Sequence, residues 1–88
     1  MANYTKNYVI NHIEDLSDRL SYVENNLQYI KVLQALKMWL IRFGEMLTDE
    51  ERVKSVDYEK WFLTGCGFSF FDRVNNSIIE YENGNRPF

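Results

Sequence analysis

The sequence predicts an all-α protein, an antiparallel helical hairpin that associates with itself. Apolar residues recur at helical spacing through most of the chain, and no Gly or Pro interrupts residues 7–43. A strand-like run at 68–70 has no second strand with which to pair. We therefore expect one long N-terminal helix at about 7–47 and a second helical segment at about 57–83. Both belong to a single domain, residues 1–88.

The stretch 29–47 is too apolar for an ordinary surface helix, which shows one apolar stripe. Its apolar residues form two rows that together cover more than half of a helical wheel: Ile30, Leu33, Leu36, Leu40, Phe43 and Leu47, then Val32, Ala35, Trp39 and Met46. A membrane span is excluded because the stretch also carries Lys31, Gln34, Lys37, Arg42 and Glu45. We expect this helix to be buried on two sides.

The N-terminal part of the long helix carries a heptad pattern typical of a coiled coil. The apolar residues follow one another at alternating spacings of about four and three: Val9, Ile13, Leu16, Leu20, Val23, Leu27 and Ile30. After Ile30 the register slips by three residues. Such a slip either overwinds a coiled coil or marks a change of partner along one continuous helix. We favour one helix, bent near Lys31.

The expected helix lengths favour an oligomer. At 1.5 Å per residue, the first helix is roughly 60 Å long and the second roughly 40 Å. The second helix is therefore too short to cover the first, and an exposed apolar stripe of this kind is normally an interface. The predicted homo-oligomer interface consists of Val9, Ile13, Leu16, Leu20, Val23 and Leu27.

Local signals divide the second half of the chain. Thr48 with Glu51 three residues later fits a capping box, which predicts a short helix over 50–54. Ser55 and Asp57 offer a further cap, and Asn83-Gly84 is a helix stop. Gly65 and Gly67 have two interpretations. They either break the second segment into helices 57–64 and 68–83, or let it lie close against Trp39 or Phe43.

Composition excludes several classes of function. Ten basic and 13 acidic residues give a net charge of −3, so neither nucleic acid nor an anionic membrane is an expected partner. The single cysteine, Cys66, permits no internal disulfide and no cysteine zinc site. His12 and Asp15 are too few for a metal site, and we expect no cofactor. No secretory leader precedes the first helix, so we expect a reducing cytoplasmic location, the host cytoplasm if the protein is viral.

One basic and aromatic patch stands out in the stretch 29–47. Lys31, Lys37 and Arg42 surround Trp39, and no acid occurs there before Glu45. Tyr22 and Tyr29 flank the heptad seam and combine a stacking face with a hydroxyl donor. The structural interpretation is that these side chains edge a buried helix. The functional interpretation is a site for a small anionic ligand, with an aromatic ring stacked on a base.

No ordered set of acid, base and nucleophile is present, so we expect no enzyme. The leading hypothesis is a self-associating helical inhibitor or adaptor that binds a protein partner, of the kind encoded by phages and mobile elements. A structural component of a larger particle is an alternative. In size and hairpin shape the chain also resembles phage-encoded sponges that capture cyclic-nucleotide immune signals. That likeness rests on residue types, Tyr22 and Tyr29 with Lys31 and Lys37, and implies a cyclic nucleotide held between subunits.

Overall fold

The computed structural model describes residues 4–63 and 68–88, and every regular element in these ranges is helical. The all-α class predicted from the sequence is confirmed. The elements are α1 (Lys6–Arg19), the 3₁₀ turn η1 (Leu20–Tyr22), α2 (Asn26–Met46), α3 (Asp49–Lys54), α4 (Val56–Phe62) and α5 (Phe70–Glu82).

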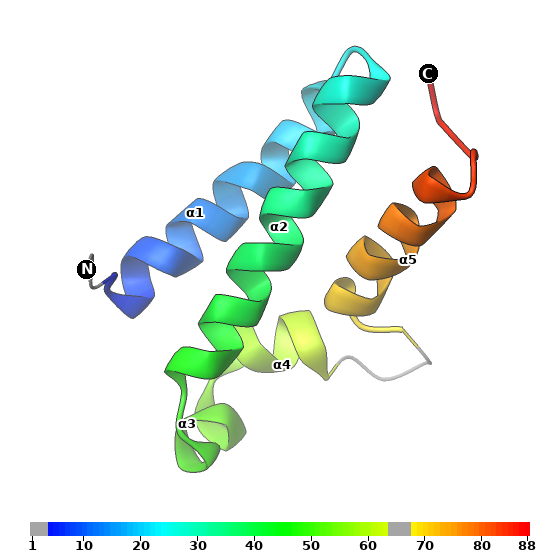
Figure 1. Cartoon of the computed structure of the whole chain (residues 1–88). Helices are drawn as coiled ribbons and strands as arrows, with labels where there is room; N and C mark the ends of the chain where they lie inside the picture. The colour runs from blue at the N-terminus through cyan, green and yellow to red at the C-terminus, as the bar shows by residue number, and fades with distance from the viewer. Residues whose placement is uncertain (1–3, 64–67) are drawn as a thin grey trace.

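Helix α2 is the central element of the fold (Figure 1). α1 packs against one side of α2 and α5 against another, and both run antiparallel to it. The short helices α3 and α4 gather at the C-terminal end of α2. The resulting shape is flat, with principal extents of 40 × 34 × 20 Å.

The structure differs from the single helix expected over 7–47, because the chain turns back after η1. Val23 is extended (φ −67°, ψ 143°), and so is Asn25 (φ −150°, ψ 170°). The Asn25 side chain accepts a hydrogen bond from the Gln28 amide at 2.9 Å, and the Gln28 side chain accepts one from the Glu24 amide at 2.8 Å. These two bonds satisfy amides at a new helix start. The predicted hairpin is therefore formed by α1 and α2, and no bend at Lys31 is needed.

The fold-back buries the N-terminal part of the heptad seam inside the chain. Val9 and Ile13 of α1 are 0% exposed and Leu16 is 7% exposed, in one cluster with the core row of α2. α4 adds Trp61 to this core, and α5 adds Val74 and Ile78. The inference from helix lengths, that part of the first helix lacks a partner within the chain, is therefore wrong. Val9, Ile13 and Leu16 pack against α2 of the same chain.

The second half follows the local signals more closely. The Thr48–Glu51 capping box is present, and Ser55 caps α4. The segment expected over 57–83 contains two helices, α4 and α5, and Ser69 caps the second of them with Asp72. α5 ends at the predicted stop, where Gly84 has a φ of +99°. Gly65, Cys66 and Gly67 lie outside the described residues.

The corner between α2 and α3 is fixed by one arginine. Arg52 donates two hydrogen bonds to the carbonyl oxygen of Gly44, from Nε at 3.2 Å and from Nη2 at 2.8 Å. This carbonyl lies in the last turn of α2, where backbone acceptors lack an amide donor four residues on, and its other hydrogen bond comes from the Leu47 amide at 3.4 Å. Lys6 of α1 also forms an ion pair with Glu51 of α3, so the start of α1 is tied to the same corner.

Within the ranges that the structure describes, no helix combines the length and the hydropathy that a bilayer crossing requires.

Proline substitutions distinguish the observed turn from a continuous helix. Asn26 is the first residue of α2 and follows an extended residue, so proline fits the backbone there. Asn26→Pro should lower the free energy of unfolding by about 1–2 kcal/mol, because it removes the two hydrogen bonds between the Asn26 side chain and the backbone of Phe88. Gln34→Pro, in the middle of the same helix, should cost about 3 kcal/mol or more. Urea denaturation measures both. Equal losses would contradict the turn at 23–25.

Candidate interaction surface on the central helix

The side of α2 that faces away from the core carries a stripe of exposed residues, here called the outer face. Its members recur at alternating spacings of about four and three, so they lie on one side of the helix: Leu27, Lys31, Gln34, Met38, Ile41 and Glu45. The buried row of the helix, Leu33, Leu36, Leu40 and Phe43, lies on the opposite side. Because α1 and α5 flank α2 in a thin fold, neither helix covers the outer face.

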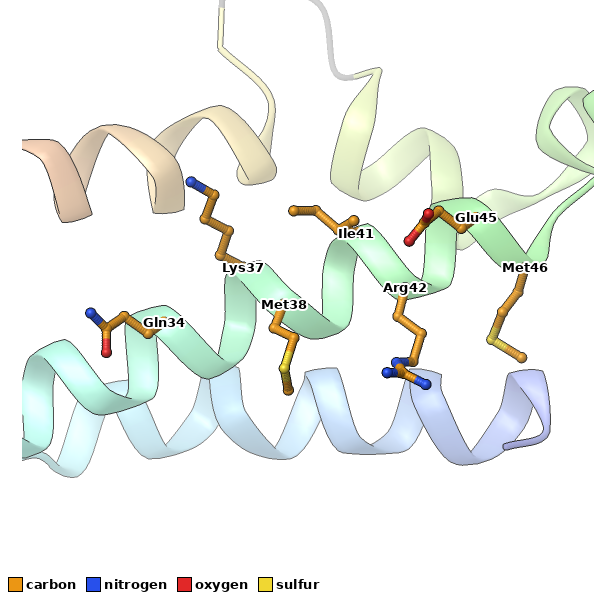
Figure 2. A pocket seen from close by; sticks show the side chains of 7 residues that line it. All are labelled: Gln34, Lys37, Met38, Ile41, Arg42, Glu45 and Met46. Carbon is orange, nitrogen blue, oxygen red and sulfur yellow. The ribbon is translucent and has the colours of Figure 1, made fainter. Parts of the chain in front are cut away.

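The C-terminal half of the outer face borders an open hollow of about 650 Å³. All of its lining residues belong to α2: Gln34, Lys37, Met38, Ile41, Arg42, Glu45 and Met46. Figure 2 shows Lys37, Ile41 and Glu45 on the side of α4 and α5, and Met38, Arg42 and Met46 on the side of α1. The hollow therefore has an apolar floor with charged groups at its edges.

Met38 and Ile41 are the apolar centre of this surface. Met38 is 51% exposed and Ile41 is 41% exposed, although both lie in the middle of the most apolar helix of the chain. Leu27, at the start of the same stripe, is 61% exposed. Exposed apolar residues that are grouped and rimmed by polar ones are typical of interaction sites.

A row of aromatic side chains on α1 and just before it lies at the edge of this surface. Tyr4 stacks on Tyr8 with ring centroids 5.1 Å apart, and Tyr8 stacks on His12 at 5.9 Å. Trp39 of α2 meets Tyr4 edge-on at 5.1 Å and His12 edge-on at 4.6 Å. Offset or edge-on aromatic pairs each add about 0.5–1.5 kcal/mol beyond their buried area. This row therefore stabilises the contact between α1 and α2.

Arg42 connects the aromatic row to the hollow. Its guanidinium carbon lies 5.4 Å from the centroid of the Tyr4 ring and 5.5 Å from that of Trp39. At these distances the cation is attracted to the ring faces. Arg42 is therefore held toward α1, on one edge of the outer face, rather than directed outward from its centre.

The six predicted ligand-binding residues do not converge on one site. Trp39 and Arg42 are neighbours, and Lys37 lines the same hollow as Arg42. Lys31 is exposed on the outer face, beyond the hollow. Tyr22 is 79% exposed in η1, and Tyr29 packs near Tyr81 and Phe88, with centroids 6.2 and 6.3 Å away.

The six predicted interface residues also separate. Val9, Ile13 and Leu16 are core residues of their own chain, and Leu20 packs against that core. Val23 is half-buried in the turn. Leu27 alone of the six both lies on the outer face and is exposed. Val9, Ile13 and Leu16 are therefore already in contact with other residues of their own chain.

No protein-family model, curated protein or solved structure matches this chain.

The part of the chain that the structure describes also offers no metal site. No group of three or more His, Cys, Asp or Glu side chains there is placed to hold a metal ion. The candidate site consequently rests on the shape, charge and exposure of α2.

Sequence reasoning missed Met38, Ile41 and Glu45 as surface residues. The stretch 29–47 is apolar on most sides, and its exposed side could not be chosen before the positions of α1 and α5 were known. A signal was nevertheless present. The polar residues Lys31, Gln34 and Glu45 recur on one face of the helical wheel, and that face also carries Met38.

Trp39 tests the aromatic contact between α1 and α2. Trp39→Ala should lower the free energy of unfolding by about 2–3 kcal/mol, less than for a fully buried Trp because Trp39 is only half-buried. Tyr22→Ala removes an aromatic ring at an exposed position and should change the free energy of unfolding by about 0.5 kcal/mol or less. Chemical denaturation of the two variants measures the difference. A neutral Trp39→Ala would show that this row does not hold α1 on α2.

Proposed function

We propose that this chain is a non-enzymatic helical interaction protein. It associates with itself and with a protein partner, and acts as an inhibitor or adaptor of the kind carried by phages and mobile elements. Its working surface is the outer face of α2. The observation that carries this proposal is the exposure of Met38 and Ile41 at the centre of the most apolar helix.

The chemistry of the outer face suits a protein partner. Met is flexible and polarisable, so it adapts to the shape of an apposed surface. The charged groups around Met38 and Ile41 can fix orientation, since Lys37 and Arg42 lie with Glu45 at the edges of the same hollow. A helix face with an apolar centre and a polar rim is a common means of docking another helix.

A pair of charged substitutions tests this proposal. Met38→Glu with Ile41→Glu should abolish association of the chain, because carboxylates would replace the apolar centre of the contact. A tagged chain is cross-linked in cells, and its covalent adducts are identified by mass spectrometry. The native mass of the purified protein is measured separately and reports self-association alone. Wild type should give adducts that the double variant lacks.

Val53→Glu with Val56→Glu is the matched control. Both valines are highly exposed, at 85% and 76%, and lie at the junction of α3 and α4, away from the outer face. This control should keep the wild-type adducts and mass. If the two double variants behave alike, the outer face of α2 is not the working surface and the proposal fails.

The sponge hypothesis remains a second candidate because of one local arrangement. Lys37 and Arg42 line one hollow, and Arg42 lies over the rings of Trp39 and Tyr4. Arg42 beside these half-buried rings can attract a phosphate, and Lys37 adds a second cation at the opposite edge of the same hollow. The separation of Tyr22 and Tyr29 from this hollow removes two of the residues that suggested the hypothesis.

Lys37→Ala tests the sponge hypothesis. Binding of a fluorescent cyclic nucleotide, followed by anisotropy, should fall at least tenfold at unchanged native mass, because one of the two cations that line the hollow is lost. Lys54→Ala, an exposed lysine of α3, should bind as wild type does. Absence of binding to wild type, or equal binding by Lys37→Ala, would exclude this function.

A further inference from the structure

We infer that the outer face of α2 docks onto the same face of a second copy of this chain, with the two α2 helices antiparallel and Met38 at the two-fold axis. This inference rests on the proposed function, since it names the occupant of the surface proposed there. It also replaces the predicted seam, whose N-terminal residues the fold buries inside one chain.

The spacing of two opposite charges around Met38 carries the inference. Lys31 precedes Met38 by seven residues and Glu45 follows it by seven, and both side chains are exposed on the outer face. Seven residues are two helical turns, about 10 Å along the axis, so both charges return to the side on which Met38 lies. In an antiparallel pair centred on Met38, each Lys31 is opposite Glu45 of the second copy, and the contact contains two such pairs.

The other directions of pairing are less favourable. A parallel pair in register would place Lys31 against Lys31 and Glu45 against Glu45, so that like charges repel. Both arrangements are two-fold symmetric and use one patch twice, so the charges decide between them. Among the described residues of its own chain, neither Lys31 nor Glu45 has an ion-pair partner.

The remaining charges near the hollow do not oppose this contact. Arg42 is held toward α1, over the rings of Tyr4 and Trp39. Lys37 points toward α5 at the opposite edge, as Figure 2 shows. The centre of the outer face is therefore left to Met38 and Ile41. Met38 would meet Met38 of the second copy at the axis, and Ile41 would lie beside it, about 9 Å from its own symmetry mate. This contact would cover Met38 and Ile41, the two exposed apolar residues in the middle of the central helix.

Charge reversal tests the register. Lys31→Glu and Glu45→Lys each replace two attractive pairs with two repulsive ones, so each variant alone should dimerise roughly tenfold more weakly than wild type. Sedimentation velocity at low ionic strength measures the dissociation constants, and circular dichroism checks that each variant keeps its helix content. An equimolar mixture of the two variants should form a heterodimer of about wild-type affinity, since both opposite-charge pairs are restored.

A cysteine pair tests the position of the axis. In a Cys66→Ser background, Met38→Cys should form a disulfide-linked dimer under mild oxidation, because residues at a two-fold axis come within the Cα separation that a disulfide allows. Gln34→Cys is the matched control. It is exposed on the same face but lies one turn from the axis, about 12 Å from its symmetry mate, and should remain unlinked.

Three results would overturn the inference. They are a wild-type monomer at tens of micromolar, single reversals that dimerise as wild type does, and a mixture that fails to form the heterodimer. If dimerisation is insensitive to the reversals but lost in the Met38→Glu, Ile41→Glu variant, the antiparallel register fails while the proposed function stands. If the Met38→Glu, Ile41→Glu variant also associates like wild type, both fail.

Discussion

The fold depends on covering α2, whose apolar residues occupy most of its circumference. One neighbouring helix cannot cover such a surface, so α1 and α5 pack against different sides of it and Trp61 of α4 adds to the core at its C-terminal end. Placing α2 between two helices buries Leu33, Leu36, Leu40 and Phe43, and it makes the fold only about 20 Å thick. A thin fold of this kind leaves one side of its central helix in contact with solvent.

The all-α class and several helix ends followed from local chemistry that needs no tertiary information. Thr48 with Glu51, Ser55, and Asn83 with Gly84 each act within a few residues, and each functions as its position indicated. The turn at 23–25 was missed because the heptad from Val9 to Ile30 continues through it without a break. An apolar seam specifies that a helix needs a partner, but it does not specify whether that partner is another chain or the next helix of the same chain. Asn25 with Gln28 three residues later was the local signal for the turn.

The candidate site was only partly predictable for a related reason. Arg42 and Trp39 are close in sequence on one helix, so their contact follows from helical geometry. The contacts of Trp39 with Tyr4 and His12 depend on the return of α1, which the sequence pattern did not reveal. Tyr22 and Tyr29 were grouped with the cations on the assumption of one continuous helix. The outer face became visible only once α1 and α5 were placed on either side of α2.

Two methionines of α2 allow the most direct test of the claim that the outer face is exposed in the single chain and covered on association. Met38 lies on the outer face, whereas Met46 packs against the core. Oxidation of each thioether by dilute peroxide, followed by peptide mass spectrometry over a range of protein concentrations, reports its exposure. At low concentration Met38 should oxidise faster than Met46, and raising the concentration should slow Met38 alone. An oxidation rate of Met38 that is independent of concentration, or no faster than that of Met46, would contradict this account.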